Sequence, residues 1–273
     1  MSDAAQERLR AGDLSGALEQ LQNGVRSRPE DAKLRIFLFQ LLCVLGDWKR
    51  AVGQLKVCAQ LDAAAIPMAQ TYREAIICEV FREKVFAGDK DALVFGEPQD
   101  WVALLAQSLN AQAAGQADRA AKLREDAFDQ APATPGELDG SAFEWIADAD
   151  SRLGPVLEIV INGKYFWMPF NVLARMSFDA PADLRDAVWM PTNLTLKNGG
   201  ELVGLVPTRY AGTAERGSDA LRLSRGTEWE DLGADGFGGL GQRLLVTDAA
   251  ETGLMDVRQI AFAETPGAAG SDG

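Results

Sequence analysis

Histidine is absent from all 273 residues of the chain. Its absence removes the commonest general acid–base group and the commonest neutral metal ligand in proteins. Cysteine is scarce as well: Cys43, Cys58 and Cys78 lie far apart among apolar residues, and no Cys-x-x-Cys pair occurs. This pattern favours buried reduced thiols over disulfides or a metal site. Any catalysis would therefore depend on carboxylates, tyrosine, lysine or cysteine, and we expect no cofactor and no metal.

Basic residues are also in deficit, which gives a formal net charge of −13. The deficit is spread along the chain, because residues 1–140 hold 16 Lys and Arg against 21 Asp and Glu, and the remainder holds 11 against 19. Affinity for nucleic acid or for anionic membranes depends mainly on Lys and Arg, so neither is an expected partner. The sequence also shows no signal-peptide pattern and no apolar run close to the roughly 20 residues of a membrane span. A cytoplasmic location is predicted.

The first half of the chain contains a degenerate repeat. Gly12-Asp13 recurs as Gly46-Asp47, 34 residues later, and each pair is followed by apolar residues at the spacing of one helix face. A period of 34 residues is typical of tetratricopeptide repeats, in which pairs of helices stack into a solenoid. We therefore predict a chain with separate α and β domains, in which residues 1–134 form a tetratricopeptide-like α-solenoid and residues 135–140 form a linker.

The second half contains short apolar runs separated by turn residues. Residues 156–161 are almost entirely apolar and are followed by Asn162-Gly163, the pair that a two-residue type I′ hairpin requires. A second hairpin is expected around residues 194–206. Short strands at such intervals predict a β-rich domain over residues 141–265, built as a small barrel or as a bent antiparallel sheet. Residues 266–273 are small or polar and are expected to form a disordered tail.

The segment between these two halves carries conflicting signals. Ser141 and Glu144 have the spacing of a helix capping box, and Gly154-Pro155 is a typical helix end, so a short helix is predicted between them. On such a helix Asp148 and Arg152 would stand four residues apart and pair. The glycine-rich run 236–241 lacks the strand–loop–helix setting of a phosphate-binding loop, and we expect a turn there.

Several phrases of the sequence resemble one known family. The run W-I-A-D-x-D-x-R-L-G-P leads into a strand, an N-G turn and an aromatic strand between Trp145 and Pro169, and further matching phrases occur at 188–191, 207–210, 219–229 and 241–248. These features resemble the ImpE family, also called SciE or TagJ, whose members are accessory proteins of bacterial type VI secretion. The resemblance implies a cytoplasmic adaptor that binds the small subunit of the contractile sheath near its N-terminal helix, with an AAA+ unfoldase as a further partner and sheath assembly or recycling as the process affected.

Candidate binding residues follow from residue types that concentrate energy at protein interfaces, above all tryptophan, tyrosine and arginine. Those that fall in the family phrases are Trp145, Asp148, Arg152, Arg209, Tyr210, Gln242 and Arg243. We expect at least one of the three arginines to be solvent-accessible beside an aromatic ring where the two domains meet. Two alternatives stay open: a carboxylate–metal enzyme centred on Asp148 and Asp150, and a chaperone-like scaffold for another secretion component.

Overall fold

The structure is a computed structural model that describes residues 3–264, so the tail expected at 266–273 lies outside the described residues. The N-terminal half is helical, as its periodicity predicts. Its elements are α1 (Asp3–Arg10), α2 (Leu14–Ser27), α3 (Ala32–Val44), α4 (Trp48–Leu61), the 3-10 turn η1 (Ala63–Ala65), α5 (Ile66–Phe86), α6 (Asp100–Ala113) and α7 (Ala117–Gln130).

The repeated Gly-Asp pair encodes a helix end followed by a helix start. Gly46 has a φ of +72° directly after α3, a conformation that glycine adopts without the steric penalty of a side chain. Asp47 then accepts a hydrogen bond from the backbone N–H of Arg50 and so caps α4. Gly12 and Asp13 do the same between α1 and α2. In each of the first two helix pairs, the Gly-Asp pair therefore determines where the first helix ends and the second begins.

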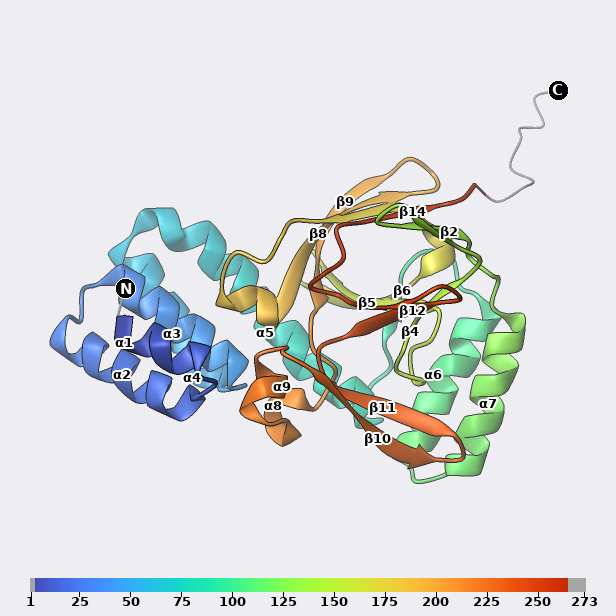
Figure 1. Ribbon diagram of the computed structural model, residues 1–273, viewed down its shortest axis with the longest axis horizontal. Helices are drawn as coiled ribbons and strands as arrows, with labels where there is room; N and C mark the ends of the chain where they lie inside the picture. The colour runs from blue at the N-terminus through green and yellow to red at the C-terminus, as the bar shows by residue number, and fades with distance from the viewer. Residues whose placement is uncertain (1–2, 265–273) are drawn as a thin grey trace.

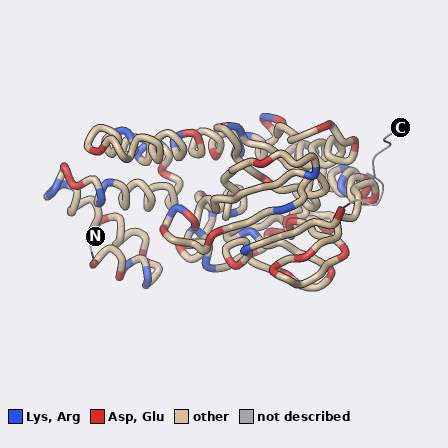
Figure 2. Tube along the Cα trace, turned by 90° about the horizontal axis from the view of Figure 1, so that it is seen from above, with Lys and Arg blue, Asp and Glu red and all other residues tan. Residues whose placement is uncertain are grey.

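The helices do not form one continuous stack. Helix α1 packs on α2 and α3 packs on α4, while α4 contacts the long helix α5. Helices α6 and α7 pack on each other at the opposite end of the molecule from α1–α4, and α5 lies between the two groups (Figure 1). Acidic and basic residues are scattered over both parts (Figure 2). The β-rich part is thus held between two groups of helices.

The β-rich part is built on an open nine-stranded sheet with the order β1-β6-β5-β9-β8-β7-β14-β2-β3. Every neighbouring pair in it is antiparallel except β1 with β6. The open arrangement matches the alternative of an antiparallel sheet and not that of a small barrel. The strands are β1 (Leu93–Val94), β2 (Gly136–Leu138), β3 (Ser141–Phe143), β5 (Val156–Ile161), β6 (Lys164–Pro169), β7 (Leu173–Phe178), β8 (Trp189–Leu196), β9 (Glu201–Pro207) and β14 (Gln259–Phe262).

Two smaller sheets complete this part. One is the hairpin of β10 (Thr227–Gly233) and β11 (Gly236–Gly241), and the other has the order β13-β12-β4. In the second sheet β4 (Ile146–Asp148) is an edge strand beside β12 (Leu244–Thr247), which also pairs with β13 (Glu251–Gly253). Short helical segments connect the strands: η2 (Phe170–Val172), η3 (Leu184–Ala187), α8 (Thr213–Arg216) and α9 (Asp219–Arg222).

Both predicted hairpins are confirmed. β5 and β6 are joined by Asn162 and Gly163 with φ values of +48° and +70°, the signs that a type I′ turn requires, and β8 pairs with β9. Strand β5 is buried along its whole length. Because side chains alternate across a strand, Val156, Glu158 and Val160 lie on the face that is directed towards the helices, and the two valines pack into the core shared with them.

The alternation of β5 explains why the two halves form one packed unit. Leu157, Ile159 and Ile161 face a second core whose buried members all come from the β-rich part. The first core continues from α3 and α5 through Trp167 and Trp189 of the sheet without interruption. The helical half also supplies strand β1 to the nine-stranded sheet. Neither half buries its apolar surface without the other.

Three local predictions differ from the structure. The helix expected between Ser141 and Gly154 is replaced by β3, β4 and a turn, and the backbone N–H of Glu144 donates to Asp248 rather than to a helix cap. The expected linker 135–140 contains β2, which pairs with β14 and β3. The run 236–241 is strand β11. For β4 and β2, pairing with strands distant in sequence overrides the local signal, whereas β11 pairs with the strand directly before it, β10.

Candidate functional site

Glu158 is the centre of a buried ionic cluster where α5 meets the sheet. It is 0% exposed and belongs to the face of β5 that is directed towards the helices. Arg82 of α5 binds it with two hydrogen bonds, Nε to Oε1 at 2.6 Å and Nη2 to Oε2 at 2.8 Å. Arg243 donates to Glu158 Oε2 from the other side, and the Tyr165 hydroxyl donates to Oε1. The carboxylate is thus surrounded by donors from helix α5, the neighbouring strand β6 and the residue directly before β12.

Arg243 extends the cluster to the motif segment. It is 0% exposed, pairs through Nη1 with Asp148 of β4, and donates from Nε to the carbonyl of Pro207 at 2.9 Å. Its guanidinium also lies 5.3 Å from the ring centroid of Tyr210. Arg243 therefore connects two carboxylates from different strands, and the predicted pairing of Asp148 with Arg152 is wrong.

The two carboxylates have opposite pKa shifts. Burial would raise the pKa of Glu158, but the charges of Arg82 and Arg243, with hydrogen bonds from Arg82 and Tyr165, lower it to about 2. Burial raises the pKa of Asp148 to about 7, and Arg243 offsets only part of this rise. Glu158 is therefore ionised over the whole neutral range, whereas Asp148 changes its protonation close to neutrality.

Asp150 and Arg152 form a separate pair beside this cluster. The Asp150 side chain is fully buried and accepts from Arg152 Nε at 2.9 Å and from the backbone N–H of Gly239 at 2.9 Å. Arg152 also lies over the ring of Phe86, 4.9 Å from its centroid, and its side chain is 11% exposed. The pair ties the turn after β4 to strand β11 and to the end of α5.

Arg209 joins the β-rich part to the end of a helix. It is 4% exposed and donates to the carbonyls of Val44 and Cys43 at 2.6 and 3.2 Å, which are the last carbonyls of α3. A cation there satisfies acceptors that have no partner within the helix and interacts favourably with the negative helix end. Burial lowers the pKa of Arg209 to about 10. Arg209 is therefore a cap for α3 supplied from the other half of the chain.

The remaining candidates are Tyr210, Gln242 and Trp145. Tyr210 is 1% exposed, and its hydroxyl accepts from the backbone N–H of Leu244 at 2.9 Å. Gln242 is half-buried and donates to the carbonyl of Ser224 at 2.7 Å. Trp145 is 41% exposed.

The structure thus brings most of the candidate residues to the junction of the two halves but buries most of them. Arg209 and Arg243 are not accessible, which corrects the expectation for these two, and Arg152 beside Phe86 keeps only a small accessible fraction. Trp145 remains the one large exposed side chain of the set. The motif residues thus share a location at this junction but not an exposed surface.

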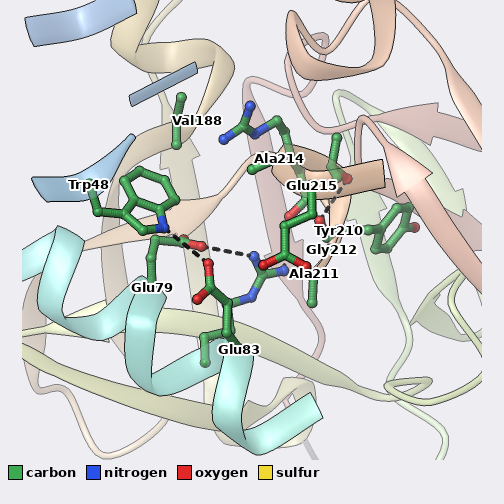
Figure 3. Close-up of a pocket in the computed structure, with 12 residues that line it drawn as sticks. Trp48, Glu79, Glu83, Val188, Tyr210, Ala211, Gly212, Ala214 and Glu215 are labelled. Atoms are coloured by element: carbon green, nitrogen blue, oxygen red, sulfur yellow. Dashed lines mark hydrogen bonds and ion pairs between the residues drawn. The ribbon is translucent and has the colours of Figure 1, made fainter. Parts of the chain in front are cut away.

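Neither Asp148 nor Asp150 is arranged as a metal ligand. Each carboxylate is engaged by an arginine, and within residues 3–264 no three His, Cys, Asp or Glu side chains are grouped so that they could hold a metal ion. Figure 3 shows a small cavity between α5 and α8, lined by Trp48, Glu79 and Glu83 among others. Its volume of about 20 Å³ suits a single water and not a substrate, for which pockets of roughly 300 Å³ or more are usual.

A larger groove lies on the outer side of β4. It has a volume of about 470 Å³, and its walls include Phe128 at the end of α7, which is 37% exposed, and Trp145. Small residues line much of the rest: Ala131, Ala133, Ala147, Ala149 and Gly154. The groove is the place where an exposed residue of the motif borders a concave surface.

Sequence reasoning missed the residues that complete the ionic cluster. Glu158 interrupts a run of branched apolar residues in a buried strand, and a lone charge in such a run indicates a buried partner of opposite charge. Glu79 and Arg82 stand three residues apart on α5 and pair at 3.3 Å, a spacing that the sequence also displays. No local signal, however, joins Glu158 to Arg243 or to Arg82, because these two contacts span 85 and 76 positions of the chain.

Comparisons with known proteins agree with the sequence resemblance. The family described as ImpE protein matches residues 140–261. A curated protein of Pseudomonas aeruginosa, named type VI secretion system accessory component TagJ, is 54% identical over 261 residues, which are 96% of this chain and 92% of that protein. A crystal structure of a Vibrio parahaemolyticus protein has the same fold, with a TM-score of 0.87 at 24% identity over 96% of this chain and 98% of the other. No helix within residues 3–264 has the length and apolar character needed to cross a membrane.

The relation to the Pseudomonas protein extends over both the helical half and the β-rich half, and the family match covers the segment that contains Trp145, Asp148, Arg209 and Arg243. The resemblance inferred from the motif is therefore confirmed, and the chain belongs to the ImpE family, to which the name TagJ also refers.

Proposed function

We propose that this protein is a non-catalytic cytoplasmic adaptor of the type VI secretion system. The observation that carries the proposal is the 54% identity to a type VI secretion accessory component over nearly the entire chain. In the proposed role the protein binds the small subunit of the contractile sheath near its N-terminal helix. It then affects sheath assembly or recycling, with the associated AAA+ unfoldase as a second partner.

The chemistry of the buried ionic cluster around Glu158 supports an adaptor rather than an enzyme. Arg82, Glu158, Arg243 and Asp148 are at most 3% exposed and are paired with one another, so they present no group to a substrate. The packing of α1 with α2 and of α3 with α4 at a 34-residue period supports the tetratricopeptide-like interpretation. Proteins of that kind offer surfaces to peptides or helices of partners.

The experiment is binding of the full-length chain to each purified sheath subunit, followed by calorimetry. The halves are unsuitable as separate baits, because they share one core and one sheet. Trp145→Ala should weaken binding by about 1–3 kcal/mol, as truncation of an interface tryptophan does, while thermal stability stays nearly unchanged because the side chain is 41% exposed. Trp229→Ala is the matched control, since Trp229 is 40% exposed on the hairpin β10–β11.

Failure of the wild-type chain to bind either subunit would overturn the adaptor proposal. A second titration tests the enzyme alternative directly. Mg²⁺, Mn²⁺ and Ca²⁺ should produce no saturable heat with the wild-type chain, because the carboxylates of Asp148 and Asp150 are engaged by arginines. Saturable micromolar binding that Asp148→Asn abolishes would favour the enzyme.

A further inference from the structure

The stack formed by the first five helices ends in an uncovered face of α5. On α3, Phe39 and Cys43 are 0% exposed, and the ring of Phe39 packs on that of Tyr72 on α5, with 5.8 Å between the centroids. The residues 34 positions later, Arg73 and Ile77 of α5, are both exposed. Helix α6, which comes next in the chain, packs on α7 at the opposite end of the molecule (Figure 1). The last helix of the stack therefore lacks the cover that α3 receives.

This face of α5 carries an apolar stripe. Ile66, Ile77 and Val80 are 41%, 56% and 37% exposed. Their spacings of 11 and 3 residues place them on one side of the helix, over a length of about 21 Å. The outer face of a terminal helix in a solenoid is normally polar, because it must remain soluble. An apolar outer face at this position indicates a surface that another molecule covers.

The stripe begins in a groove between α4 and α5. The groove has a volume of about 520 Å³. Each wall presents the residues at i, i+3, i+4 and i+7 of one helix, beginning at Val52 on α4 and at Ile66 on α5. A third helix fits such a groove, because its side-chain ridge can pack between the two walls. An extended peptide would find few backbone partners there, since backbone groups along a helix bond within it.

The charged residues that line the groove are both basic. They are Lys56 on α4 and Arg73 on α5, and both are exposed. Lys84 carries the same charge along the stripe, because it follows Arg73 by 11 residues and so lies on the same side of α5. Among residues 3–264 none of these three cations takes part in an ion pair.

Two acidic residues lie close to the groove in sequence but do not line it. Asp62 caps η1, where its carboxylate accepts a hydrogen bond from the backbone N–H of Ala64 at 2.9 Å. The carboxylate of Glu74 lies at the turn between β5 and β6, where an added Cβ on Gly163 would come within 2.8 Å of Oε2. The chain has a net charge of −13, so a groove with only basic charges is a local exception that is complementary to an anionic occupant.

We propose that the apolar stripe of α5 and the groove beside it bind an acidic amphipathic helix of a partner protein. Apolar side chains of that helix pack between α4 and α5 and along the stripe, and its Asp or Glu residues pair with Lys56, Arg73 and Lys84. A second copy of this chain fits less well, because a symmetric dimer would bring the cations of one α5 against those of the other. The assignment gives a location and a ligand chemistry to the adaptor function proposed above, and it rests on that function only for the identity of the partner.

The experiment uses the full-length chain and a fluorescein-labelled peptide of about 18 residues, in which Leu at helical spacing forms one face and Glu fills the others. Its counterparts are a Leu–Lys peptide of the same pattern and a Leu–Glu peptide with a central proline, which breaks the helix. Fluorescence anisotropy should show saturable binding of the Leu–Glu peptide and none of either counterpart. Non-specific attraction to an acidic protein would instead favour the Leu–Lys peptide.

Variants of the full-length chain locate the binding surface. Ile77→Ala should weaken binding of the Leu–Glu peptide about tenfold or more. Arg73→Glu should weaken it as well, and should give the Leu–Lys peptide a measurable affinity, because the substitution reverses a charge in the groove. Val203→Ala removes an aliphatic side chain that is 69% exposed on β9, and Arg119→Gln removes an exposed cation from α7. These two matched controls should change neither affinity, and circular dichroism of each variant should show unchanged helix content.

Several results would overturn the assignment: equal effects of Ile77→Ala and Val203→Ala, a preference for the Leu–Lys peptide, or no saturable binding. Equal affinity for the proline-containing peptide would exclude a helical occupant. Sedimentation velocity tests the remaining occupant. A wild-type chain that dimerises and an Ile77→Ala chain that stays monomeric would show that a second copy covers the stripe, and would overturn the proposal.

Binding of purified sheath subunits distinguishes this inference from the proposed function. If the Leu–Glu peptide binds as described but no sheath subunit does, the assignment of the stripe and groove stands and the sheath-binding function fails. If a sheath subunit binds but the Leu–Glu peptide does not, the adaptor function stands and the assignment fails.

Discussion

Replacement of Arg243 by methionine removes a buried cation while it keeps most of the side-chain volume. In the native structure Arg243 neutralises Asp148 and shares Glu158 with Arg82. After the substitution Glu158 keeps Arg82 and Tyr165, so the uncompensated charge falls on Asp148. Breaking a buried pair in this way costs about 3–5 kcal/mol of the free energy of unfolding.

The cost should depend on pH, because Asp148 can take up a proton instead of remaining as an unpaired buried anion. Its pKa is already about 7 with Arg243 present, and loss of the cation raises it further. The destabilisation by Arg243→Met should therefore be smaller at pH 6 than at pH 8. Urea denaturation at both pH values, followed by tryptophan fluorescence, measures the difference.

Arg216→Met is the matched control, because Arg216 pairs with Glu230 at 2.9 Å but both side chains are more than a third exposed. It should cost less than about 1 kcal/mol. The reasoning would be refuted if Arg243→Met lowered the free energy of unfolding by less than about 1 kcal/mol at pH 8, or by equal amounts at both pH values. Either result would mean that Asp148 does not depend on Arg243 for its charge compensation. The double variant Asp148→Asn with Arg243→Met should recover part of the lost stability, since it leaves no unpaired anion.

Three further outcomes are expected. The folded-state pKa of Glu158 lies below its unfolded value, so its contribution to the free energy of unfolding is complete above about pH 4.5 and is lost as the pH falls towards 2. Asp148 acts in the opposite sense: it favours the folded state below about pH 4, and this effect is lost as the pH rises through 7. Asp148→Asn should therefore remove only the second pH dependence from denaturation curves. Arg209→Met removes the donor of the Val44 carbonyl, while the Cys43 carbonyl keeps the backbone N–H of Gly46, and the substitution should lower the free energy of unfolding by about 1.5–3 kcal/mol; a loss under about 0.5 kcal/mol would contradict the cap. Gly154→Ala should cost at least about 1–2 kcal/mol because of its positive φ and its contact with Phe128, and an unchanged urea midpoint would contradict this requirement.

Sequence reasoning succeeded where local rules decide the structure. The Gly46-Asp47 pair marked a helix end and start, and Asn162-Gly163 marked a hairpin, because in both cases a few adjacent residues determine the backbone conformation. It failed between residues 141 and 154, where β4 exists only because β12, about a hundred residues later, pairs with it. A helix signal of four residues cannot compete with a strand pairing that no local pattern reveals.

The same distinction explains which part of the candidate site was predictable. The motif arginines lie at the junction of the two halves, where Arg152 covers Phe86 of α5 and Arg209 binds the end of α3. Their accessibility was not predictable, because Arg209 and Arg243 find their acceptors in α3 and β5, far away in sequence. In this chain, a motif rich in arginine and aspartate therefore marks the place where the helices and the sheet are joined. The exposed side chain available to a partner lies beside it, at Trp145.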